Sequence, residues 1–116
     1  MSHANDSERL RHILAAIGDI ESFLGTSDLE AFLTSRKDQL AVCMSFAIIG
    51  EAAGKLSAGL CSIHPEIPWR EMVSMRNVVI HGYGDTDFQT VWDTAKNDLP
   101  QLKAQITAIL AEMPPQ

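Results

Sequence analysis

The spacing of the apolar residues is the sequence feature that most constrains the fold. They recur at intervals of three and four along most of the chain, which places them on one side of an α-helix with ~3.6 residues per turn. The first such series is Leu10, Ile13, Leu14, Ile17, Ile20, Phe23 and Leu24. Apolar residues make up 46% of the chain and aromatic residues only 6%, a balance that favours packing between helices. The sequence therefore predicts an all-α fold, a small bundle of four to five helices.

Residues that cap or end helices divide this pattern into separate elements. Asp6 or Ser7 is expected to cap the first helix, and Gly25 is expected to end it. Ser27 or Asp28 can then cap a short second helix.

A long third helix is predicted from Ser35 to about Ser57, with Gly59 as its stop. One stripe at three- and four-residue steps carries Leu40, Cys43, Phe46, Ala47, Gly50, Ala53 and Gly54. Further apolar residues flank that stripe, namely Val42, Met44, Ile48, Ile49 and Leu56. A surface this wide indicates packing on two sides. The second side is covered either by a partner subunit or by other helices of the same chain.

Polar and small residues near the end of this helix allow two interpretations each. Gly50 and Gly54, four residues apart, either let another helix approach closely or are merely tolerated inside a bundle. Glu51 and Lys55 have the spacing of a surface ion pair, unless Glu51 points toward a functional site.

The second half of the chain contains a loop and a fourth helix. The loop is predicted over residues 62–68, with His64 exposed in it. The helix is predicted from near Trp69 to about Ile80, and Gly82 is expected to end it.

The last helix is predicted to start at Phe88, where Thr86 or Asp87 can cap it. Pro100 should kink or restart this helix, with Asp98 as the new cap, because proline lacks the backbone N–H that a helix interior uses.

Length and composition limit the possible functions. The 116 residues are predicted to form a single domain, 1–116, with an ordered core over about 7–111. Cys43 and Cys61 lack metal-type spacing and are expected to be buried thiols, and no metal site or cofactor is predicted. No signal peptide or membrane span is recognisable, so a cytoplasmic protein is expected. The net charge of −6 argues against a generally basic nucleic-acid binder, so any such binding must use a local patch.

The polar residues of the fourth helix form the candidate site. Arg76, Asn77, His81 and Tyr83 lie close together in the sequence. On a regular helix Arg76 and His81 would be about 140° apart, so they can meet only if the chain turns near Gly82. A histidine at a helix C-terminus is favoured in its protonated form, which suits acid–base chemistry. Spacing alone favours a structural explanation of the cluster: a solvated arginine, a capping histidine and a half-buried tyrosine.

These residues and their surroundings resemble the HEPN superfamily. Arg76, Asn77 and His81 match the Arg, polar residue, spacer and His of its ribonuclease members, and Tyr83 matches the extended form of the HepT branch. HepT is the toxin of HepT/MntA toxin–antitoxin pairs. Segments similar to those of the HepT branch occur in the same order along the chain, at 49–53, 67–72, 91–93 and 98–100. The resemblance extends from about Leu10 to Leu110.

The resemblance implies a homodimer that brings two Arg/His pairs into a shared cleft and cleaves RNA without a metal. Arg76 and His81 would be catalytic with Asn77 assisting, and Tyr83 would accept AMP from an MntA-like nucleotidyltransferase antitoxin. The alternative is a non-catalytic helical module that docks a nucleotidyltransferase. An unrelated small helical dimer is a third reading.

Overall fold

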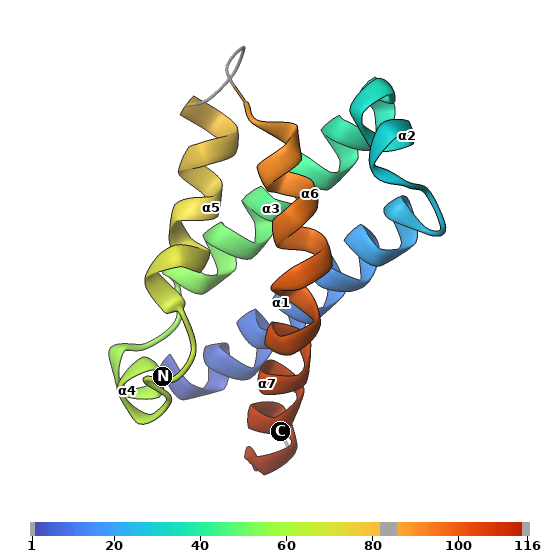
Figure 1. Ribbon diagram of the computed structural model, residues 1–116. Helices are drawn as coiled ribbons and strands as arrows, with labels where there is room; N and C mark the ends of the chain where they lie inside the picture. Colours follow the sequence, from blue (N-terminus) through green and yellow to red (C-terminus); the bar gives the residue numbers. More distant parts are fainter. Residues whose placement is uncertain (1, 82–85, 115–116) are drawn as a thin grey trace.

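The computed structural model describes residues 2–81 and 86–114, which form helices joined by short connections (Figure 1). The helices are α1 (Ser2–Leu24), α2 (Leu29–Thr34), α3 (Arg36–Gly54), α4 (Ala58–Ile63), α5 (Trp69–His81), α6 (Phe88–Asn97) and α7 (Leu99–Glu112). No strand occurs within these two ranges. The predicted all-α fold is therefore confirmed. Among the described helices, none is long and apolar enough to cross a membrane.

Helix α3 is the centre of the arrangement. Helix α1 packs along one side of it and α5 along another, while α7 packs on α1 (Figure 1). The two-sided packing predicted for α3 is thus provided by helices of the same chain. The core between these helices contains side chains without exposed surface, among them Leu10, Ile13, Ile17, Phe32, Val42, Ile49, Met72 and Ile106. Burying each such side chain contributes roughly 1.5–3 kcal/mol.

Most helix boundaries follow their local signals. Gly25 ends α1 with a φ of 49°, a conformation that glycine adopts without strain. Asp28, Ser35 and Asp87 each accept a hydrogen bond from a backbone N–H in the first turn of the following helix. The last helix does restart as predicted, with Pro100 in the first turn of α7. Asp98 occupies the N-cap position there, but its side chain makes no capping hydrogen bond.

The beginning of α1 differs from the prediction. The helix starts at Ser2, and Asp6 and Ser7 are buried within it instead of capping it. The carboxylate of Asp6 accepts hydrogen bonds from the backbone N–H of Ser57 at 2.9 Å and from its hydroxyl at 2.5 Å. Asp6 therefore holds a distant segment in place, which is why its helix-capping signal was misleading.

The region after α3 also differs. Helix α3 ends at Gly54, not near Ser57, and Gly59 lies inside the short helix α4, which Ser57 caps. The loop predicted over 62–68 begins only after Ile63. The His64 side chain is only 20% exposed, and its carbonyl accepts a hydrogen bond from the indole N–H of Trp69 at 2.9 Å. The contact between Asp6 and Ser57 explains the early stop, because it fixes the start of α4.

Candidate functional site

Arg76 lies where α5 comes closest to α3. A Cβ built on Gly50 would be 2.7 Å from the backbone nitrogen of Arg76 and 2.8 Å from its Cβ, which is closer than real Cβ atoms come to other atoms. Gly54 is different, because a Cβ there would be 3.9 Å from the nearest atom, a methyl group of Val73. The close helix approach predicted for the two glycines is therefore needed at Gly50 and not at Gly54.

The guanidinium of Arg76 forms an ion pair across this contact. Its Nη1 donates a hydrogen bond to Oε1 of Glu51 at 2.8 Å, and Nζ of Lys55 lies 3.6 Å from Oε2 of the same carboxylate. Both Arg76 and Glu51 are about half exposed, at 47% and 48%. Arg76, through its hydrogen bond and charge, lowers the pKa of Glu51, and Lys55 adds to the effect. Glu51 thus points at the candidate site and is more than a surface partner of Lys55.

A cleft of ≈ 260 Å³ surrounds this ion pair. It is lined by residues of α3 and α5, including Asn77, which is exposed beside Arg76. A second cavity of ≈ 140 Å³ shares Glu51 and Lys55 with the first and extends to Arg9 and His12 of α1. Sequence reasoning did not assign Arg9, His12 and Lys55 to the site, because their proximity depends on how three helices pack.

Basic residues outnumber acidic ones around these two cavities. Among the described residues, their linings contain Arg9, His12, Lys55 and Arg76, against the single carboxylate of Glu51. Opposite charges close together largely compensate, since Glu51 pairs with Arg76 and Lys55, and His12 lies 4.0 Å from Glu8, which is not in the linings. Arg9 forms no ion pair with any residue that the structure describes. The arrangement suits the binding of an anion such as a phosphate.

The remaining predicted site residues lie at the edge of the described structure. His81 is the last described residue of α5, so the helix extends at least to the predicted position near Ile80, and its predicted end at Gly82 lies outside the described residues. The side chains of residues 78–81 are outside the described part, as are Gly82 and Tyr83 in full. The approach of His81 to Arg76 and the place of Tyr83 remain predictions.

Helix α3 also carries apolar side chains on its exposed surface. Leu40, Met44 and Ile48 are 54%, 63% and 40% exposed, and their four-residue steps place them along one face. Within the predicted stripe Cys43, Phe46 and Ala53 are buried, whereas Leu40 is exposed. Leu40, Met44 and Ile48 together form what we call the α3 stripe, which leads along the helix toward Glu51.

Neither the two thiols nor a metal site adds a second candidate among the described residues. Cys43 is buried and Cys61 partly buried, both are free, and burial raises the pKa of each thiol. A raised pKa disfavours the reactive thiolate. Over the ranges that the structure describes, no three His, Cys, Asp or Glu side chains are grouped as metal ligands would be.

Comparisons with known proteins match most of the chain. The family described as "Ribonuclease HepT-like" matches residues 13–109. A protein of Thermococcus cleftensis described as a probable ribonuclease HepT is 43% identical over 96 residues, covering 83% of this chain and 87% of its own. A protein of Methanocaldococcus jannaschii described as a putative RNase is 34% identical over 104 residues, 90% of each chain. Another from Caldanaerobacter subterraneus, also described as a putative RNase, is 30% identical over 101 residues, 87% of this chain and 90% of its own. No solved structure matches the chain significantly.

Proposed function

The chain belongs to the ribonuclease HepT-like family, and on this basis we propose that it is a metal-independent endoribonuclease, the toxin of a toxin–antitoxin pair. The observation that carries the proposal is the family match over residues 13–109, which spans Arg76, Asn77 and His81. The exposed guanidinium of Arg76 in a cleft rich in basic groups supports it.

The proposed reaction is a transesterification within the RNA strand. The 2′-oxygen attacks the adjacent phosphorus as its proton leaves, and the bond from phosphorus to the 5′-oxygen breaks as that oxygen gains a proton. His81 of one copy either accepts the proton of the 2′-oxygen or donates a proton to the 5′-oxygen, and His81 of a second copy performs the other transfer. Acid–base catalysis of this kind raises the rate roughly 10²- to 10⁴-fold. Arg76 binds the phosphate and stabilises the charge that develops on its oxygens, and Asn77 orients it. A guanidinium carries five N–H donors, so a phosphate can bind beside Glu51.

We further propose that two copies form the complete site. The α3 stripe supports this, because three large apolar side chains on one exposed helix face are typical of a surface that a partner covers. A second copy seated there would lie next to Glu51 and Arg76, which follow the stripe along α3 and α5. The second Arg76 and His81 could then reach the same RNA strand.

The dimer is tested with Met44→Glu, which places a charge in the centre of the stripe. We expect the protein to change from dimer to monomer in light scattering after size-exclusion chromatography, with its helical circular dichroism retained. Ala31→Glu, on the exposed surface of α2, is the matched control and should remain dimeric. A wild-type protein that is monomeric at all concentrations would contradict the proposal.

Tyr83 is the proposed regulatory residue. An MntA-like nucleotidyltransferase antitoxin would transfer AMP to its phenol, releasing pyrophosphate if ATP is the donor. Tyr83 follows His81 by two residues, so an adenylate there adds negative charge and bulk near the proposed phosphate position. Repulsion between this charge and the RNA backbone would inhibit cleavage.

The whole proposal is tested by RNA cleavage with purified variants. Arg76→Ala and His81→Ala should each lose at least about 100-fold in cleavage rate, the usual size of such contributions. Lys103→Ala removes an exposed lysine of α7 that lines neither cavity around Arg76 and should cleave as wild type does. Tyr83→Phe should retain cleavage and resist inhibition by the nucleotidyltransferase. A wild-type protein that cuts no RNA but still binds a nucleotidyltransferase would instead identify a non-catalytic binding module.

A further inference from the structure

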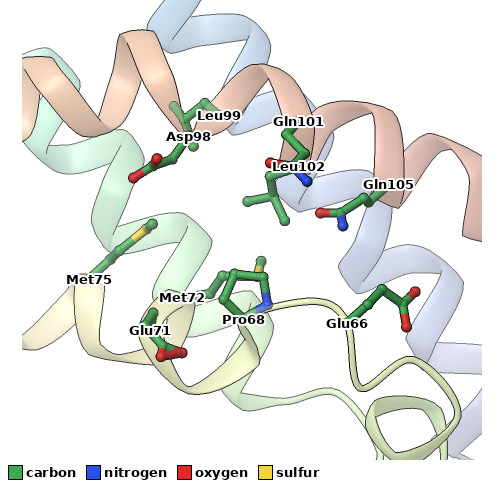
Figure 2. A pocket seen from close by; sticks show the side chains of 10 residues that line it. All are labelled: Glu66, Pro68, Glu71, Met72, Met75, Asp98, Leu99, Gln101, Leu102 and Gln105. Atoms are coloured by element: carbon green, nitrogen blue, oxygen red, sulfur yellow. The ribbon is translucent and has the colours of Figure 1, made fainter.

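A groove runs along the side of α5 that faces away from Arg76. Helix α5 packs extensively on α3 but only slightly on α6 and α7, so space remains between them. A cavity of ≈ 450 Å³ lies between the start of α5 and α7 (Figure 2). A second, of ≈ 370 Å³, continues between α5 and α6 above Phe46 of α3. The two share Glu71, Met75 and Asp98, so we treat them as one feature, the α5–α7 groove.

The floor of this groove is apolar. Met72 and Leu99 belong to the core, with 0% and 1% exposure, and Leu102 lies beside them. Met75 is partly exposed on the wall, and Figure 2 shows it across the groove from Leu99 and Leu102. Because these core side chains have almost no exposed surface, the apolar surface that another molecule can reach is that of Met75 and Pro68. A methionine side chain adapts to differently shaped partners.

Among the residues that the structure describes, the rim of the groove carries negative charge alone. This part of the lining contains the carboxylates of Glu66, Glu71, Asp87 and Asp98, and no Lys, Arg or His. Glu71 and Asp98 are exposed and form no ion pair with any residue that the structure describes. These two exposed carboxylates are therefore available to a cationic partner.

We propose that the α5–α7 groove is a docking site for a basic amphipathic helix of a partner protein. Apolar residues of that helix would pack on Met75 and Pro68, and flanking Lys or Arg residues would pair with Glu71 and Asp98. A helix suits the groove because the walls of the groove are helices. These walls present side chains for packing and no free backbone groups with which an extended peptide could pair. The proposal does not depend on the ribonuclease activity.

Charge complementarity selects this occupant over the others. RNA is disfavoured because its phosphates would meet four carboxylates. A second copy of this chain is a poor partner here, because its net charge of −6 adds repulsion to an acidic rim.

The test uses labelled amphipathic peptides of ~16 residues with Leu and Met on one helical face and Lys and Arg on the other, followed by fluorescence anisotropy. We expect them to bind the full-length protein at low salt and weaken as salt increases. Peptides with Glu in place of the basic residues should not bind. Failure of every basic peptide to bind, or equal binding of the acidic ones, would overturn the proposal.

Paired charge reversals locate the binding. Glu71→Lys with Asp98→Lys should weaken basic-peptide binding about tenfold, because two attractions become repulsions. Asp19→Lys with Glu112→Lys makes the same change in net charge on exposed positions outside the groove and should leave binding unchanged. The neutral pair Glu71→Gln and Asp98→Asn should give a smaller loss of peptide affinity. It replaces the charge reversal if the reversal disturbs folding. Equal weakening by both reversals would show nonspecific attraction and refute the site, as would displacement of the peptide by RNA or by a second copy of the chain.

Discussion

The two sides of α5 differ in charge and in packing. Val73, Arg76 and Asn77 face α3 and a cleft in which basic residues predominate. Glu71 and Met75 point the opposite way, since ~100° per residue places them on the other side of the helix. They face a groove whose described lining contains no basic residue. On the first side α5 lies so close to α3 that a Cβ at Gly50 would overlap the backbone of Arg76. The second side of α5 is left open.

This difference shows that net charge is a poor guide to what an acidic chain can bind. A helix is about 10–12 Å across with its side chains, and the Debye length under physiological conditions is about 8 Å. Carboxylates beyond α5 are therefore largely screened from a phosphate bound at Arg76. One helix can thus separate an anion-binding cleft from an acidic groove, and the following predictions test how independent the two sides are.

The largest expected effect concerns the floor of the groove and compares two methionines. Met72→Ala should lower the free energy of unfolding by about 3 kcal/mol, because its side chain is fully buried and its loss leaves a cavity. Met75→Ala should cost less than about 1 kcal/mol, because Met75 is partly exposed on the groove wall. Urea denaturation of both variants measures the difference. Equal losses would mean that the groove is part of the core and not an open surface.

The next prediction concerns the packed side and compares two glycines. Gly50→Ala should lower the free energy of unfolding by about 2 kcal/mol, because the new methyl group would overlap the backbone of α5 at Arg76. Gly54→Ala should raise it by about 0.5 kcal/mol, because alanine favours the helix and finds space there. Thermal unfolding of each variant provides the measurement. A stabilised Gly50→Ala protein would show that α5 can shift away from α3 without cost.

The parts of the fold that sequence alone predicted depend on neighbouring residues. Gly25, Ser35 and Asp87 mark helix ends through hydrogen bonds or backbone conformations within a few positions, and Pro100 restarts a helix for a local reason. The start of α1 and the end of α3 were wrong, because the hydrogen bonds between Asp6 and Ser57 join positions 51 residues apart.

The candidate site also has a part that depends on neighbouring residues and a part that depends on distant ones. Arg76 and Asn77 were predicted as site residues from the sequence of one helix, but the role of Glu51 stayed open because its hydrogen bond to Arg76 joins residues 25 positions apart. The exposure of Leu40, Met44 and Ile48 could not be predicted either. An apolar pattern shows which residues avoid water, and it does not distinguish a core from a surface that a partner covers.

The smallest predicted effect concerns the ion pair itself. Arg76 holds the pKa of Glu51 below the ordinary value of 4.5, so the pair is present at neutral pH and is lost as the pH falls through the lowered value. In an NMR titration of the side-chain carboxyl carbon, Arg76→Ala should move the pKa of Glu51 back toward 4.5, with Lys55 holding it slightly lower. Arg36→Ala should leave it unchanged. If Glu51 titrates alike in all three proteins, Arg76 is not held in solution, and RNA phosphate would not have to compete with Glu51 for it.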